Sequence, residues 1–307
     1  MEIELEEIVE LRFDDGTPVR AASAVVPFGD GFLVVQDDAT YAAWVRVDSV
    51  VPVGLLPAVQ GRRQFEDATG TKHLKPDLEA ACEITVDGRD AVLMLGSGSS
   101  PARMRSALTV LRDDVPEVLI ADLSALYDRV ARALEVETEL LNLEGACVVG
   151  DTLHWFQRGM PAAGIPTGSV DLDCAEVLAA ARGELDPGQV RVHRARPLRL
   201  GSVSGIGLGT TDAVTLPGGG ILVSAAAEDS PNPRDDGPVV GSALALLVDH
   251  EVQGVSALPE VRGATSKVEG LMVLDSHPAQ LALLAVVDQD DATAASLALR
   301  LRVRTSP

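Results

Sequence analysis

The stretch that decides the fold is EGACVVGDTLHWFQRG (residues 144–159), in which the turn-forming pair Gly150-Asp151 separates two short apolar runs. Short apolar runs on either side of such a turn predict a β-hairpin. Four other segments have the same form: a polar or acidic first residue, an apolar run, a turn signal and a second apolar run. They begin at Ser23, Glu79, Asp212 and Glu269. This recurrence predicts a protein built from five repeats.

Each repeat of about 60 residues is long enough for four short antiparallel strands. A third strand-like run follows every hairpin, and a fourth follows in four of the repeats, at 50–59, 116–122, 189–198 and 251–261. Radial repetition of four-stranded antiparallel sheets is the architecture of a β-propeller. The sequence therefore predicts an all-β protein with five propeller blades. Six blades are the alternative, if one of the longer repeats holds an additional blade.

The two ends of the chain predict how the ring closes. The fifth repeat ends after its third strand at 297–303, whereas the N-terminal segment 3–13 is strand-like and has no other assignment. Pairing the two supplies the missing fourth strand and leaves no open sheet edge. We therefore expect residues 1–307 to form a single propeller domain. Apolar residues at helical spacing also predict short helices at 123–134 and 174–181, within connections between strands.

Composition limits the partners and the location. The chain has 46 acidic and 25 basic residues, a net charge of −21, which repels nucleic-acid phosphates and anionic membrane surfaces. No stretch approaches the roughly 20 apolar residues of a membrane span. The first ten residues, MEIELEEIVE, lack the basic and apolar regions of a secretory signal. We expect a cytoplasmic protein without nucleic-acid or membrane partners.

Polar residues recur where the first strand of each repeat begins and where the second strand ends. In an antiparallel sheet these two points lie at the same edge. We therefore expect the polar side chains to meet at one mouth of the central channel and to bind a small molecule there. The predicted ligand-binding residues are Lys75, Asp77, Glu79, Arg103, Asn142, Glu144, Gln157, Arg158, Asp212, Glu228, Asp229, Lys267 and Glu269.

Four carboxylates near one axis require compensating positive charge. Nearby lysines and arginines supply it, or a bound cation does. Oxygen ligands favour calcium or magnesium over zinc, so calcium is the expected ion. The alternative to a ligand or metal site is a structural role, in which each acid accepts backbone hydrogen bonds from the neighbouring blade. The candidate metal ligands are Glu79, Glu144, Asp212 and Glu269.

A resemblance to known proteins rests on the strand starts KPDLEAAC (75–82), LNLEGACVVGDTLHWFQRG (141–159), GLGTTDAVTL (207–216) and KVEGLMVLD (267–275). With the loops GSGSSPARMR (96–105) and AAAEDSPN (225–232), these segments resemble a family of bacterial propellers of unassigned function, loosely grouped with phytase-like and esterase-like propellers. The resemblance spans nearly the whole chain. It implies calcium at the channel mouth and the hydrolysis of phosphate esters or lactones, with the four acids named above as metal or substrate ligands.

Two functional hypotheses follow. The first is a small-molecule-binding propeller that acts as a metal-assisted hydrolase of a phosphoester, ester or lactone at the channel mouth. The second is a propeller without catalytic activity that binds a small ligand or a protein partner. The second is favoured by the absence of a recognisable nucleophile–base pair. The Walker A, HExxH and CxxC patterns are also missing from the sequence.

Overall fold

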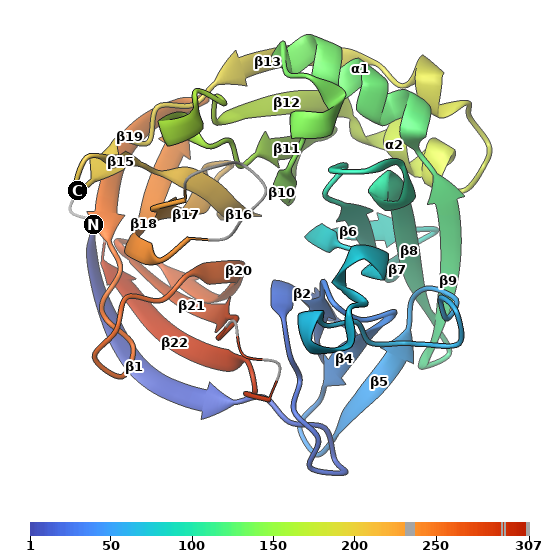
Figure 1. The fold of residues 1–307 in the computed structure, drawn as a ribbon, viewed down its shortest axis with the longest axis horizontal. Helices are drawn as coiled ribbons and strands as arrows, with labels where there is room; N and C mark the ends of the chain where they lie inside the picture. Colours follow the sequence, from blue (N-terminus) through green and yellow to red (C-terminus); the bar gives the residue numbers. More distant parts are fainter. Residues whose placement is uncertain (231–236, 290, 292, 305–307) are drawn as a thin grey trace.

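The computed structural model describes residues 1–230, 237–289, 291 and 293–304, which form five four-stranded antiparallel sheets around a central channel (Figure 1). This confirms the predicted five-bladed β-propeller. Four of these sheets are meanders of consecutive strands, and in the fifth the N-terminal strand is added beside the C-terminal one. The first strands of adjacent blades contact one another in a closed ring.

The blades follow the chain in order, with the first strand next to the channel. Blade 1 contains β2 (Ala22–Phe28), β3 (Gly31–Gln36), β4 (Tyr41–Val45) and β5 (Val50–Gly54). Blade 2 contains β6 (Leu78–Val86), β7 (Arg89–Gly96), β8 (Arg105–Arg112) and β9 (Val115–Asp122). Blade 3 contains β10 (Leu143–Val149), β11 (Thr152–Gln157), β12 (Gly168–Asp173) and β13 (Val192–Pro197). Blade 4 contains β16 (Gly209–Thr215), β17 (Ile221–Glu228), β18 (Val239–Val248) and β19 (Glu251–Ala257). Blade 5 contains β20 (Val268–His277), β21 (Gln280–Val287), β22 (Leu297–Arg304) and β1 (Glu2–Glu10).

The N-terminal strand closes the ring as expected. β1 pairs antiparallel with β22, from Glu2 opposite Arg304 to Glu10 opposite Leu297. Figure 1 shows β1 running alongside β22 on the outside of this blade. Ile3, Leu5 and Ile8 of β1 pack on the core of blade 5, while its glutamates are exposed on this outermost strand. A charged outer edge disfavours pairing with a further strand.

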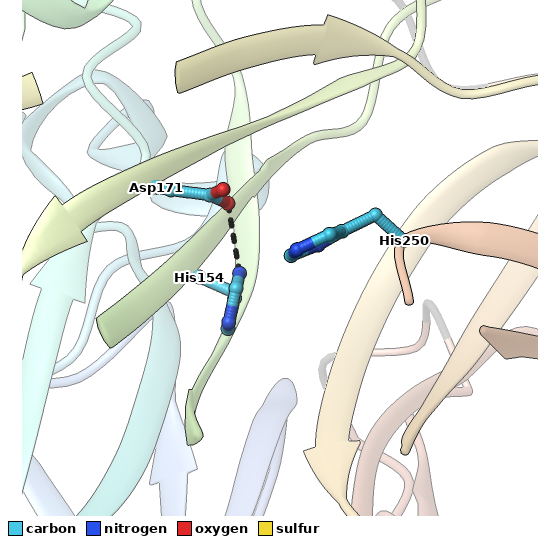
Figure 2. A group of neighbouring side chains, drawn as sticks. All are labelled: His154, Asp171 and His250. Atoms are coloured by element: carbon cyan, nitrogen blue, oxygen red, sulfur yellow. Dashed lines mark hydrogen bonds and ion pairs between the residues drawn. The ribbon is translucent and has the colours of Figure 1, made fainter. Parts of the chain in front are cut away.

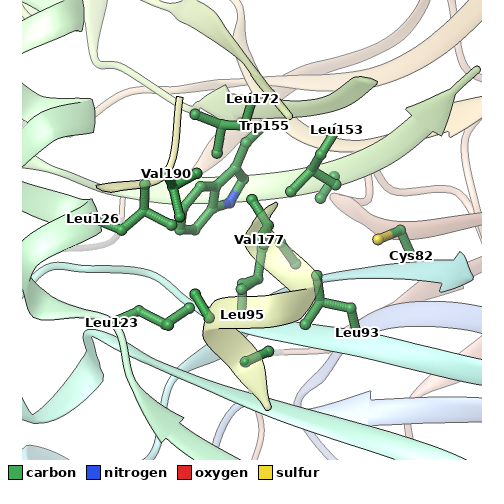
Figure 3. Packing of buried hydrophobic residues seen from close by; sticks show 14 of the residues in the cluster. Cys82, Leu93, Leu95, Leu123, Leu126, Leu153, Trp155, Leu172, Val177 and Val190 are labelled. Carbon is green, nitrogen blue, oxygen red and sulfur yellow. The ribbon is translucent and has the colours of Figure 1, made fainter. Parts of the chain in front are cut away.

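The core lies between neighbouring blades, and the two predicted helices complete it on one side. α1 (Ser124–Leu134) and α2 (Cys174–Ala181) pack against blades 2 and 3 (Figure 1). Trp155 is fully buried there (Figure 3) and meets the ring of Tyr127 edge-on, with centroids 4.9 Å apart. Burying two large aromatic side chains stabilises this interface strongly.

The three cysteines, Cys82, Cys147 and Cys174, are buried and unpaired. Burial raises the pKa of Cys147 to about 12, so its thiol stays protonated. A small hairpin of β14 (Ser202–Val203) and β15 (Ile206–Gly207) between blades 3 and 4 lies outside the sequence-based expectations. No helix in the described part of the chain is long and apolar enough to cross a membrane.

Candidate functional site

A β-bulge recurs near the start of every first strand. The pairing register with the second strand shifts by one residue at Ser23 in β2, Glu79 in β6, Glu144-Gly145 in β10, Thr211 in β16 and Glu269 in β20. A bulge turns one side chain out of the regular alternation of the strand. In blades 2, 3 and 5 the residue at this position is a glutamate that lines a cavity at the channel mouth.

The remaining two blades carry hydroxyl groups at the bulge, and both bond to the next blade. Ser23 Oγ donates a hydrogen bond to the Leu78 carbonyl at 2.6 Å. Thr211 Oγ1 donates to the Val268 carbonyl, also at 2.6 Å. These carbonyls belong to the residues that precede Glu79 and Glu269. The hydroxyls therefore join adjacent blades just below two of the cavity glutamates.

The residue after the bulge approaches the next blade closely. A Cβ on Gly145 would lie 2.7 Å from the Asp212 Cα, and one on Gly270 would lie 2.7 Å from the Val25 nitrogen. Asp212 holds the corresponding position in blade 4, and its carboxylate accepts a hydrogen bond from the Leu271 amide at 2.6 Å. The Glu-Gly pairs of the sequence thus combine a cavity side chain with a close contact between blades.

The cavity has a volume of about 650 Å³ and is lined by residues from all five blades. The predicted ligand-binding residues that it brings together are Lys75, Asp77, Glu79, Arg103, Asn142, Glu144, Arg158, Glu228, Lys267 and Glu269. Asp37, Ser99 and Asp288 also line it, as their positions just after second strands predict, although they are not in the set of predicted ligand-binding residues. Sequence reasoning missed Asp67, Lys72 and Glu139, which line the cavity from the connections that precede first strands.

Three residues of the predicted set lie elsewhere. Asp212 faces blade 5, because it occupies the position after the bulge rather than the bulge itself. Gln157 accepts a hydrogen bond from the Asn142 amide and donates one to the Leu140 carbonyl, so it supports the loop that carries Asn142. Asp229 is exposed and does not line the cavity.

One ion-pair network joins blades 1 and 2 around Lys75. Its ammonium contacts Asp37, lies 2.6 Å from Asp77 and lies 3.8 Å from Glu79. Asp77 is also 2.9 Å from Arg103 and accepts hydrogen bonds from Ser97 and Ser99. Glu79 accepts no hydrogen bond from any residue that the structure describes, although its side chain is only 16% exposed.

A second network joins blades 3, 4 and 5. Arg158 lies 3.1 Å from Glu144 and 2.6 Å from Glu228. Lys267 lies 3.1 Å from Glu228 and 2.8 Å from Glu269. Because these five side chains are at most 15% exposed, removing one charge would leave its partners buried and uncompensated.

The surroundings give the cavity acids different proton affinities. Burial opposes the ionisation of Asp77, but the charges of Lys75 and Arg103 outweigh it and lower the pKa. Burial, followed by the charges of Asp37 and Asp77, raises the pKa of Glu79 well above its ordinary value. Burial also raises the pKa of Glu269 to about 8. The cavity acids therefore differ in proton affinity: Asp77 is the stronger acid, and Glu79 and Glu269 are the weaker ones.

Opposing effects act on the pKa of Glu144, the third cavity glutamate. Burial raises the pKa of Glu144, while Arg158 and Lys267 act in the opposite direction. Its Oε1 atom accepts hydrogen bonds from Asn142 at 2.7 Å and from Arg158 at 3.1 Å. Its Oε2 atom is buried without a hydrogen-bond partner among the described residues. One oxygen of this carboxylate is thus fixed and the other is unpartnered.

The carboxylates of the cavity are better suited to pairing with the protein's own lysine and arginine side chains than to binding calcium. Asp37, Asp77 and Glu79 place oxygen atoms within 4.8 Å of one another, a spacing suited to a metal ion. The Lys75 ammonium, however, contacts all three. The four predicted metal ligands do not converge either, since Glu144 and Glu269 belong to the second network and Asp212 faces blade 5. We therefore derive no chemistry through calcium.

Fold and site together define a five-bladed β-propeller with a carboxylate-rich cavity at its channel mouth. The chain belongs to the family of unknown function DUF6910, whose model matches residues 71–292. No curated protein matches the sequence. The resemblance to phytase-like and esterase-like propellers stays a prediction.

Solved structures share the fold at low sequence identity. A mannose phosphorylase from Leishmania mexicana is 13% identical, with a TM-score of 0.51 over 98% of this chain and 89% of that one. A protein assigned as an exo-β-1,3-galactanase from Bifidobacterium bifidum is 11% identical, with a TM-score of 0.50 over 98% and 93%. A GH43 β-1,3-galactosidase is 9% identical, with a TM-score of 0.50 over 96% of this chain and 58% of that one.

Proposed function

We propose that the cavity binds a small, neutral, hydroxyl-rich molecule and that the protein hydrolyses a glycosidic bond in it by general acid–base catalysis. The observation that carries the proposal is the contrast between two buried cavity glutamates. Glu79 has no hydrogen-bond donor and a strongly raised pKa, whereas Glu144 keeps two donors on one oxygen. Two carboxyl groups whose surroundings separate their proton affinities are the usual basis of acid–base catalysis.

The charge of the cavity favours a neutral substrate over a phosphoester. Its acidic lining residues are Asp37, Asp67, Asp77, Glu79, Glu139, Glu144, Glu228, Glu269 and Asp288. Its basic lining residues are Lys72, Lys75, Arg103, Arg158 and Lys267. The acids outnumber the cations, so the field repels a phosphate group. Hydroxyl groups, in contrast, can donate hydrogen bonds to carboxylates and accept them from ammonium and guanidinium groups.

In the proposed reaction Glu79 is the acid. It donates its proton to the oxygen of the leaving group as the carbon–oxygen bond breaks. A water molecule forms the new bond to carbon and gives a proton to Glu144 Oε2, the oxygen without a hydrogen-bond partner. Asn142 and Arg158 position this carboxylate through Oε1. Proton exchange with solvent then restores both groups.

The neighbours in fold guide the choice of test substrates. The names of the three structures compared above refer to mannose, galactan and galactose chemistry. Their identity to this chain is too low to transfer an activity, so their weight here is limited to the choice of first substrates. Aryl mannosides and galactosides are therefore the substrates to test first.

The test is a hydrolysis assay with aryl glycosides, esters, lactones and phosphoesters. We expect turnover of a glycoside, and a loss of about 100-fold or more in kcat for Glu79→Gln and for Glu144→Gln. Glu83→Gln is the matched control, because Glu83 lies on the same strand as Glu79 but is exposed and outside the cavity. Activity of Glu79→Gln equal to that of Glu83→Gln would remove Glu79 from the mechanism.

A binding role without catalysis is the second candidate. It is favoured by the ion-pair networks, in which Lys75, Arg158 and Lys267 already neutralise most of the buried acids. A ligand that raises the Tm of the protein and is recovered unchanged would support this role. Indifference to every small molecule tested would point instead to a protein partner.

A further inference from the structure

A second polar cluster lies between blades 3 and 4, at the end of the strands away from the cavity. The β10–β11 hairpin turns at Gly150-Asp151, opposite the end that carries Glu144, and His154 lies close to this turn. His154 in β11 and Asp171 in β12 are cross-strand partners, with 2.8 Å between Nδ1 and Oδ1. Both are buried, at 5% and 6% exposure.

The third member of the cluster comes from the neighbouring blade. His250 lies in the turn between β18 and β19, and its ring centroid is 5.4 Å from that of His154. Figure 2 shows its ring projecting toward the His154–Asp171 pair. One ligand atom from each of the three residues lies within 4.8 Å of the other two. Two blades thus contribute to one compact group of potential metal ligands.

The turn that carries His250 is unusual in composition. Asp249 and His250 both have left-handed backbone angles, with φ of 48° and 68°. Two-residue hairpin turns of this kind strongly prefer glycine at the second position. A histidine there is locally unfavourable, yet it is the residue that brings an imidazole to the facing blade.

The two carboxylate oxygens of Asp171 contact different residues. Oδ2 forms an ion pair with Arg196, whereas Oδ1 faces His154. A metal ligand is commonly held in place by a second polar group of this type. The guanidinium charge also opposes the approach of a cation, so we expect weaker affinity than in a site with four protein ligands.

We propose that His154, Asp171 and His250 bind a divalent transition-metal ion, for which zinc is best suited, and that the bound ion links blade 3 to blade 4. Two imidazole nitrogens and one carboxylate oxygen form a donor set that zinc accepts, with a fourth position open to water or a ligand. Calcium and magnesium prefer oxygen ligands alone. The site is separate from the proposed catalytic cavity.

The experiment is a titration of untagged, chelator-treated protein with zinc chloride, followed by calorimetry, and with cobalt chloride, followed by visible absorption. His250→Gly removes one ligand, and glycine suits the left-handed angle of this turn, so the variant is expected to fold. His277→Asn is the control, because His277 is exposed, lies 3.1 Å from Asp275 and belongs to neither group of potential metal ligands found among the described residues.

We expect one zinc ion per chain in the wild type and in His277→Asn, and at least a tenfold loss of affinity in His250→Gly. Zinc at about 100 times its Kd should raise the Tm of the wild type by about 5 °C, and calcium should not. Zinc binding to His250→Gly as tight as to the wild type would overturn the proposal. The absence of zinc and cobalt binding to the wild type would overturn it as well.

Discussion

Replacing Gly145 by alanine tests the close approach of blades 3 and 4. The residue has φ of +68°, where alanine costs about 1–2 kcal/mol. The new Cβ would lie 2.7 Å from the Asp212 Cα and 2.8 Å from the Ala213 nitrogen. Because backbone atoms cannot rotate away as a flexible side chain can, overpacking should add about 1–3 kcal/mol. We expect the free energy of unfolding to fall by about 2–5 kcal/mol.

Gly150→Ala in the same hairpin provides the control. Gly150 has φ of +59°, but a Cβ there would meet no atom within 4 Å. It should therefore show only the conformational cost of about 1–2 kcal/mol. Urea unfolding of both variants, followed by circular dichroism, measures the difference between them. Equal destabilisation would refute the close packing of β10 on β16.

Three other predictions concern the networks and the ring closure. The pKa of Glu269 rises from 4.5 to about 8 on folding, so the unfolded state loses this proton first and the free energy of unfolding should fall between pH 4.5 and 8. Glu269→Gln should flatten that decline in urea titrations at pH 5 and pH 8, and an unaltered slope would contradict the shift. Above pH 8, where Glu269 is also ionised, Lys267→Met leaves two buried carboxylates without this cation and should cost about 3–5 kcal/mol in thermal unfolding, whereas a loss below about 1 kcal/mol would argue against the network. Deleting residues 1–10 uncovers the edge of β22 and should cause association detectable by light scattering, and a stable monomer would show that β1 is dispensable.

The fold could be predicted because its signals are local and repeated. A turn signal such as Gly150-Asp151 defines a hairpin without reference to the rest of the chain. Helical spacing at 123–134 and 174–181 likewise indicated α1 and α2. The β14–β15 hairpin was missed because its two-residue strands are too short to show periodicity. Ring closure could be predicted because the fifth repeat lacks a fourth strand and the N-terminal segment 3–13 has no other assignment.

The site could be predicted less completely, because a bulge changes the alternation of side chains by one residue. The sequence repeats align Asp212 with Glu144, since both are acids before an apolar run. In the structure Thr211 holds the bulge position of blade 4 and Asp212 holds the position that follows. A slip of one residue exchanges the two faces of a strand. The hydroxyl shared by Ser23 and Thr211 was the sequence signal that could have corrected the alignment.

The two positions at each bulge are under different constraints. The residue after the bulge lies against the next blade, and in four blades it is alanine or glycine, at positions 24, 80, 145 and 270. Asp212 is the exception, and it is accommodated because the Leu271 amide binds its carboxylate. The bulge residue itself is not restricted to small side chains, since it is glutamate in three blades and a hydroxyl residue in two. The ring geometry therefore fixes the packing position and leaves the bulge position free to carry chemistry. On this reasoning the properties of the cavity depend chiefly on Glu79, Glu144 and Glu269, and burial together with the neighbouring acids and cations sets the proton affinity of each.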